Sequence, residues 1–77
     1  MSVGNNIKAV RIERYIPQQD LARGVSCTQR SISRYETGES CPTLEMALRI
    51  ACYLNLGLDK LFYLKPDENA KINTLST

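Results

Sequence analysis

The sequence QQDLARGVSCTQRSISRYETG, residues 18–38, predicts two short helices joined by a tight turn. Its apolar side chains are spaced so that each short helix buries one face. These apolar positions are Leu21, Ala22, Val25, Ile32 and Tyr35. The second helix keeps polar side chains on its outer face, namely Gln29, Arg30, Ser33 and Arg34. Such a stretch is typical of a helix-turn-helix, in which the second helix enters the major groove of DNA.

The ends of the two helices are marked by residues with known positional preferences. A proline at position 17 suits the first turn of a helix and disfavours helix in the residue before it, so we expect the first helix over 17–23. Residues 24–27 form the turn, and Thr28 is a good N-cap for the second helix. That helix should end near Glu36, because Gly38 provides a stop.

Further helices are predicted on both sides of this stretch. We expect a helix over about residues 4–14 and, after a loop, a strongly amphipathic helix capped by Thr43. The apolar positions of that later helix are Leu44, Ala47, Leu48, Ala51 and Leu54. Leu58, Leu61 and Phe62 suggest one or two turns of a final helix, while residues 65–77 lose periodicity and are expected to form a mobile tail. The predicted fold class is all-α, a compact bundle of about five short helices.

Length and composition exclude several classes of protein. A chain of 77 residues allows one small domain with little room for a catalytic cleft. With no histidine, no paired-carboxylate motif and no phosphate loop, we expect neither an enzyme nor a cofactor. The start of the chain lacks the features of a signal peptide, and no apolar run approaches the roughly 18 residues of a membrane span. We therefore expect a cytoplasmic protein.

The three cysteines do not form a metal-binding pattern. Cys27, Cys41 and Cys52 make an odd count without a Cys-x-x-Cys spacing, so we expect no zinc site. Small apolar fillers in a reducing compartment are the favoured interpretation, with a redox role as the alternative. Cys27 is expected in the core of the turn, and Cys41 in a loop is expected to react most readily.

Charge is distributed unevenly along the chain. The formal net charge is +2, but residues 1–34 hold six basic and two acidic residues, a net charge of +4, whereas residues 35–77 hold four basic and six acidic residues, a net charge of −2. The positive half contains most of the helix-turn-helix. Attraction to phosphates should therefore act where the recognition helix lies, and binding should weaken as salt rises.

Five groups of residues, in order, resemble the lambda-repressor-like or Xre-type helix-turn-helix regulators, which include the phage Cro proteins. The resemblance covers residues 7–62, which we interpret as a Cro-type domain with its motif at 18–37. Its marks are IKAVR at 7–11, Gln18 with Leu21-Ala22, SISRYETG at 31–38, PTL at 42–44 and LDKLF at 58–62. The resemblance implies a double-stranded DNA partner.

The resemblance also implies roles for individual residues. Thr28, Gln29 and Arg30 occupy positions where members of the family touch base edges, and Arg34 is positioned for a base or a phosphate. Independently of the family, glutamine pairs with adenine and arginine with guanine, and each such pair discriminates by about 1 to 3 kcal/mol. Solvated side chains are the alternative interpretation of any outward face. The local positive charge, and the absence of an acid among these four residues, favour DNA contact.

Phosphate contacts are expected around the recognition helix. The resemblance implies that Gln18 anchors a phosphate and braces a side chain of the recognition helix. Thr37 and Ser40 are candidates for phosphate contact from the following loop. Ser33 either reaches a phosphate or, like Ser31, is small to permit close packing.

Two further positions are expected to be structural, and three depart from the family pattern. The resemblance implies an ion pair between Arg11 and Glu36 that is partly buried. Ser26 and Tyr15 stand where the family often has glycine, so the turn is expected to be strained or differently shaped. Pro17 replaces the usual hydroxyl cap.

We therefore expect a prokaryotic or phage transcriptional regulator, and a repressor by the habit of the family. Paired half-sites about 34 Å apart would double the readout, so we expect a homodimer on a near-palindromic operator. Its interface is expected within the apolar residues of 54–64, and Tyr35 and Tyr53 are expected in core or dimer contacts, with base stacking as the alternative. A second hypothesis is an antitoxin-like interaction module, in which the tail 66–77 binds a protein partner and DNA binding is autoregulatory.

Overall fold

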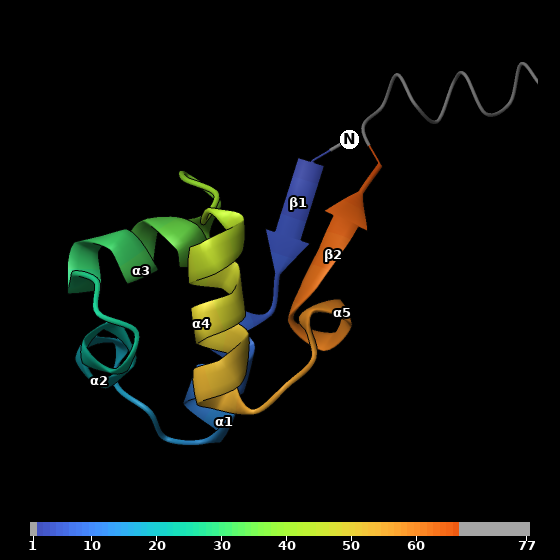
Figure 1. The fold of residues 1–77 in the computed structure, drawn as a ribbon. Coiled ribbons are helices and arrows are strands. Elements are labelled where there is room, and N and C mark those ends of the chain that lie inside the picture. The colour runs from blue at the N-terminus through green and yellow to red at the C-terminus, as the bar shows by residue number, and fades with distance from the viewer. Residues whose placement is uncertain (1, 67–77) are drawn as a thin grey trace, which may run out of the picture.

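The computed structural model describes residues 2–66, which form five helices beside a two-stranded sheet (Figure 1). In chain order the elements are β1 (Ser2–Asn5), α1 (Ile7–Glu13), α2 (Gln18–Gly24), α3 (Gln29–Thr37), α4 (Leu44–Leu54), α5 (Leu58–Leu61) and β2 (Phe62–Lys65). The five expected helices are present. The expectation of an all-α fold is wrong, because the two ends of the described chain pair as strands.

The sheet joins residues from opposite ends of the described chain. β1 runs antiparallel to β2, with Val3 opposite Leu64 and Gly4 opposite Tyr63. The first helix therefore begins at Ile7 and not near residue 4, and the Oδ1 of Asn5 accepts a hydrogen bond from the Ile7 N–H at 3.1 Å. Pairing between distant segments leaves no helical or local turn pattern, which is why local spacing did not predict it.

Gly4 permits the close approach of the two strands. It is buried, and a Cβ at this position would lie 2.5 Å from the ring of Tyr63 on the opposite strand. Glycine is normally unfavourable within a strand, but it is used where another segment approaches closely. In Figure 1 the two-stranded sheet of β1 and β2 lies to one side of helices α1 to α4.

The core lies between the helices and is composed of aliphatic side chains. Its buried members are Ile7, Leu21, Ala22, Val25, Ile32, Ile50, Ala51, Leu54 and Leu61. The expected apolar stripe of α4 is partly wrong, since Leu44 is 70% and Leu48 49% exposed. Helix α4 is rotated about its own axis relative to the expectation, so that Ile50 faces the core in place of Leu44 and Leu48. Both stripes have helical spacing, and only packing chooses between them.

Several helix ends are formed as expected. Thr28 and Thr43 are the N-caps of α3 and α4, and their hydroxyls accept hydrogen bonds from the backbone N–H groups of Ser31 and Met46, both at 3.1 Å. Pro17 precedes α2 without a side-chain cap. Gly38 ends α3 with a left-handed φ of 83°, a conformation that glycine adopts without steric cost.

Two residues carry the strain expected where the family often has glycine. Tyr15, after α1, has a φ of 58°, and Ser26, in the turn before α3, has a φ of 62°. A left-handed conformation costs a residue with a Cβ roughly 1 kcal/mol or more. The chain therefore accepts this cost at both bends that orient α2.

The C-terminal expectation is corrected in part. Lys65, expected at the start of a mobile tail, is the last residue of β2, while residues 67–77 of that predicted tail lie outside the described part of the chain. The longest helix between Ser2 and Pro66 has 11 residues, too few to cross a bilayer, which needs about 20.

The cysteines differ in their surroundings. Cys27 is half-buried against the core, and burial raises the pKa of its thiol. Cys41 and Cys52 are exposed. Because the thiolate is the reactive form, Cys27 is the least suited of the three to react.

Candidate nucleic-acid interface

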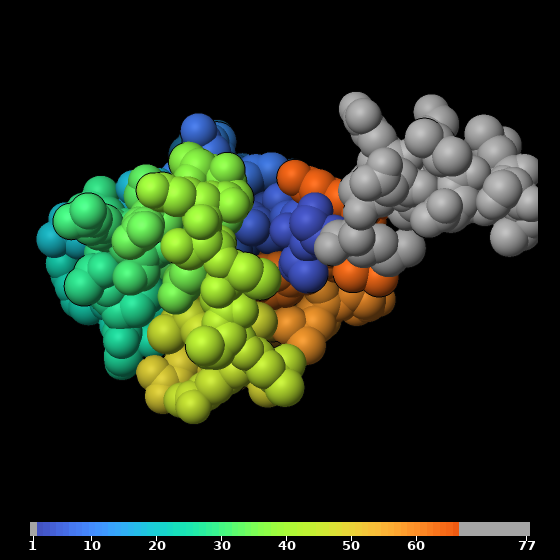
Figure 2. Space-filling model, turned by 90° about the horizontal axis from the view of Figure 1, so that it is seen from above, coloured from blue at the N-terminus to red at the C-terminus, as the bar shows by residue number. Residues whose placement is uncertain are grey.

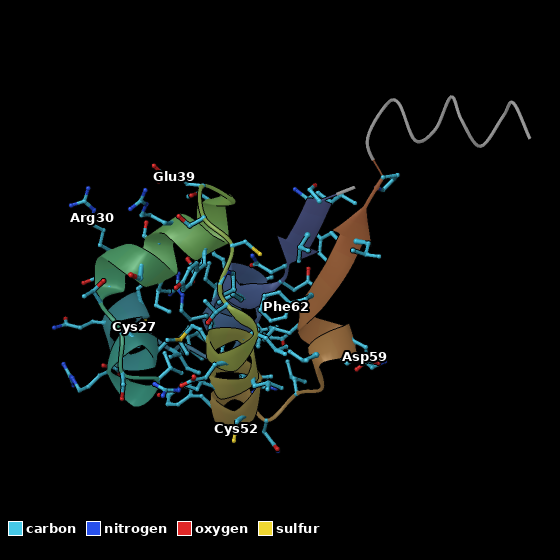
Figure 3. The ribbon with its side chains drawn as sticks, turned by 45° about the horizontal axis from the view of Figure 1, so that its top comes forward. Cys27, Arg30, Glu39, Cys52, Asp59 and Phe62 are labelled. Carbon is cyan, nitrogen blue, oxygen red and sulfur yellow. The ribbon has the colours of Figure 1, made fainter. Side chains whose placement is uncertain are left out.

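The outer face of α3 is exposed along the helix. Ile32 holds the inner face in the core, together with Leu21 and Val25 of the preceding helix and turn. Figure 2 shows α3, in green, and the loop to α4, in yellow-green, forming one continuous surface. Figure 3 shows Arg30 projecting from this surface away from the body of the molecule. A helix held in this way by its neighbour can present side chains to a groove.

Gln29 is held in place by a chain of hydrogen bonds that begins in the interior. The Nε2 of Gln18 donates to the Oε1 of Glu36 at 2.9 Å, and the Nε2 of Gln29 donates to the Oε1 of Gln18 at 3.3 Å. A carboxylate only accepts, so it sets the direction of both amides. One N–H and the carbonyl oxygen of the exposed Gln29 remain available for another partner.

The first link of this chain is a buried ion pair. The Nε of Arg11 lies 2.7 Å from the Oε2 of Glu36, and the side chains are 12% and 2% exposed. Arg11 also donates to the backbone oxygen of Ile16 at 2.9 Å and makes a second bond to the other carboxylate oxygen at 3.2 Å. The two residues that the resemblance paired thus lie together and connect α1 to α3.

Thr28 lies at the start of α3 with its hydroxyl already engaged. Besides accepting the capping bond, this hydroxyl donates to the Oγ of Ser31 at 3.0 Å. Its methyl group is the part that remains for contact with a base. Ser33 is half-buried further along the helix.

Arg34 has an acidic neighbour in the loop after α3. Its Nε lies 3.5 Å from the Oε2 of Glu39 in the loop after α3. The backbone oxygen of Arg34 accepts hydrogen bonds from the Thr37 hydroxyl and the Ser40 N–H, both at 3.2 Å. The last turn of α3 and the loop therefore bring the acidic Glu39 close to three predicted site residues, namely Arg34, Thr37 and Ser40.

Several of the basic residues counted in the positive half are paired with acids. Arg23 lies 3.9 Å from Asp20 on α2, in addition to the pairs made by Arg11 and Arg34. Across residues 2–66, Arg30 takes part in no salt bridge. The positive charge of the α3 face is therefore concentrated at Arg30, more narrowly than the count along the chain suggests.

Among the described residues, the surface of α3 offers hydrogen-bonding groups and not a cluster of metal ligands. Within the described residues, no three side chains of the His, Cys, Asp or Glu type lie close enough together to hold a metal ion. The polar groups at the surface of α3 are amides, hydroxyls and guanidinium groups. These groups suit recognition of base edges and phosphates by hydrogen bonding.

Comparison with known proteins gives consistent matches. Residues 7–61 match the family model described as helix-turn-helix. An uncharacterized HTH-type transcriptional regulator of Methanocaldococcus jannaschii is 28% identical over 64 residues, covering 83% of this chain and 97% of the relative. A candidate DNA-binding protein from Bacteroides fragilis has a solved structure with a TM-score of 0.74 and 29% identity, covering 80% of this chain and 100% of that chain. A transcriptional regulator from Listeria innocua has a TM-score of 0.71 and 25% identity, covering 95% of this chain and 76% of that chain.

Proposed function

The chain belongs to the Xre-like helix-turn-helix family, and from this premise we propose that it is a DNA-binding transcriptional regulator that reads double-stranded DNA with α3. The names of its relatives, from an archaeon and two bacteria, support a prokaryotic regulator of this class and not an enzyme. The observation that carries the proposal is the arrangement at the start of α3, where an anchored Gln29 stands next to the exposed Arg30.

These two side chains read bases in the proposed complex. Gln29 pairs with adenine through its remaining N–H and its carbonyl oxygen, and Arg30 pairs with guanine. Gln18 positions Gln29, since its Oε1 accepts from Gln29 while one of its two N–H groups donates to Glu36. Its second N–H remains available for a phosphate. Thr28 contributes its methyl group, which suits the methyl group of thymine.

In the proposed complex, contacts to the DNA phosphates surround the base-reading residues Gln29 and Arg30. Thr37 and Ser40 lie at the end of α3 and in the loop. The Ser40 hydroxyl can donate to a phosphate, and the Thr37 hydroxyl can do so by leaving the backbone oxygen of Arg34 to which it donates in the free protein. Ser33 is proposed as a further phosphate contact, and Arg34 as a contact to a base or a phosphate. Gln18, at the N-terminus of α2, completes this set.

We propose that the protein acts as a homodimer and a repressor in the cytoplasm. One short recognition helix reads few base pairs, whereas two copies related by a two-fold axis read both halves of a near-palindromic operator. Repression requires only that the bound protein occupy its site.

The test is a fluorescence-anisotropy titration against duplexes tiling the region upstream of the protein's own gene, at two salt concentrations. We expect tight, salt-sensitive binding to one near-palindromic duplex. Arg30→Ala should lower affinity for this duplex about 5- to 150-fold, the equivalent of one bidentate base contact. Lys60→Ala, which removes an exposed cation from α5, is the matched control and should bind as the wild type does. Equal, weak binding to every duplex would contradict the proposal.

A further inference from the structure

Glu39 is an acidic residue on the surface that is proposed to face DNA. It lies between Thr37 and Ser40, two of the proposed phosphate contacts, and Figure 3 shows it on the same side of the molecule as Arg30. The loop is held against α3, because the Ser40 N–H donates to the backbone oxygen of Arg34 at 3.2 Å. In the proposed complex, a carboxylate in this position faces the DNA phosphates, which carry the same negative charge.

The partner of Glu39 is a proposed DNA contact. The Nε of Arg34 lies 3.5 Å from the Glu39 carboxylate, and the two side chains are 45% and 63% exposed. An exposed pair of this kind is weak and exchanges readily with other partners. A guanidinium group binds carboxylate and phosphate with the same hydrogen-bonding fork. Arg34 can therefore be held by Glu39 in the free protein or by a phosphate in the complex.

We infer that Glu39 competes with DNA phosphates for Arg34 and so lowers affinity for DNA of any sequence. This inference rests on the proposed function of α3. Gln29 and Arg30 are not bonded to Glu39, so their base contacts are unaffected. Because the phosphate backbone is the same in every sequence, Glu39 lowers the affinity for the operator and for other sequences alike and leaves the ratio between them unchanged.

The experiment compares Glu39→Gln with the wild type on the operator duplex and on an unrelated duplex, over a range of salt concentrations. Glu39→Gln should raise affinity for both duplexes by a similar factor, about two- to fivefold at low salt. The dependence of log K on log salt should steepen by about one unit, because one further phosphate is neutralised. Asp59→Asn is the matched control: Figure 3 places Asp59 at the opposite end of the molecule from Arg30, so its affinities should be unchanged.

A double-mutant cycle tests whether Glu39 acts through Arg34. In an Arg34→Gln background, Glu39→Gln should have a clearly smaller effect than in the wild type. An equal gain in both backgrounds would show direct repulsion and overturn the competition, as would no gain in the wild type. If the wild type binds no duplex at all, the proposed function itself fails, which is a distinct result. Thermal melting of each variant checks that it is folded.

Discussion

The pair between Arg11 and Glu36 is the residue-scale contact on which both the core and the reading surface depend. The side chain of Glu36 is 2% exposed, and with Arg11 removed its carboxylate would lose its countercharge. We therefore expect Arg11→Ala to lower the free energy of unfolding by about 3 to 5 kcal/mol, the usual cost of breaking one side of a buried pair. Urea denaturation followed by circular dichroism measures this loss.

A surface pair in the same protein provides the control for this prediction. Arg23 and Asp20 are 72% and 52% exposed and lie 3.9 Å apart. Arg23→Ala should therefore cost under about 1 kcal/mol. Adding Glu36→Gln to the Arg11→Ala variant should recover part of the loss, because the buried charge is then gone. Similar denaturation midpoints for Arg11→Ala and Arg23→Ala would refute the structural role of the buried pair.

Backbone strain at Tyr15 gives a prediction of the opposite sign. Its φ is 58°, and its side chain is 92% exposed, so removing the ring loses little packing. Tyr15→Gly should raise the free energy of unfolding by about 0.5 to 1 kcal/mol, since relief of the left-handed strain exceeds the entropic cost of glycine. Tyr15→Ala keeps the Cβ and should give no gain. Equal unfolding midpoints for the two variants would count against strain at this bend.

At the scale of elements, helices were predictable because their information is local. Caps and breakers mark the ends of α2, α3 and α4 in the sequence itself, and two of the predicted caps, Thr28 and Thr43, make their expected bonds. The strands were not predictable in this way, because each is four residues long and depends on a partner at the other end of the chain. The rotation of α4 likewise depended on which of two apolar stripes packs better.

The cap of α4 permits a test of one such local feature. The Thr43 hydroxyl satisfies the N–H of Met46, which has no partner within the helix. Thr43→Ala should lower the free energy of unfolding by about 1 kcal/mol, while Thr43→Ser keeps the hydroxyl and should stay close to the wild type. Thermal unfolding of the two variants measures the difference. A serine variant as unstable as the alanine variant would show that the methyl group, and not the cap, matters here.

The sequence predicted that the residues of the candidate site lie on or beside α3 and that Arg11 pairs with Glu36, but it did not predict the salt bridge of Arg34. Gln29 and Arg30 follow from the position of α3 alone. The contact between Arg34 and Glu39 does not follow from the position of α3. It depends on the left-handed Gly38 and the following loop, which turn the chain so that Glu39 lies close to Arg34. Charge counted along the chain therefore overestimates the positive charge that the face presents.

At the scale of the whole molecule, part of the exposed apolar surface lies around the two strands and the start of α4. The hydrophobic residues of 54–64 expected at a dimer interface are divided, because Leu54 and Leu61 are fully buried while Tyr63 is 45% exposed. Exposed apolar side chains lie on β1, β2 and the start of α4, namely Val3, Leu44, Tyr63 and Leu64, while Ile12, Tyr15, Leu48 and Tyr53 are exposed elsewhere. An apolar hollow connects these elements, lined by Val3, Cys41, Pro42, Leu44, Ala47, Leu58 and Phe62. A core of nine buried side chains is small, so association over this surface would add stability.

Dimerisation through this surface leads to a prediction at Leu44. Its side chain is 70% exposed, so Leu44→Lys should leave the fold of each chain intact while placing a charge in the interface. We expect sedimentation to show dimers for the wild type at tens of micromolar and monomers for Leu44→Lys. The wild-type melting temperature should also rise with protein concentration, because association stabilises only the folded chain. Ile12→Lys, at an exposed apolar position on α1, is the control and should remain dimeric. A wild type that sediments as a monomer in this range would confine dimer formation to the DNA itself.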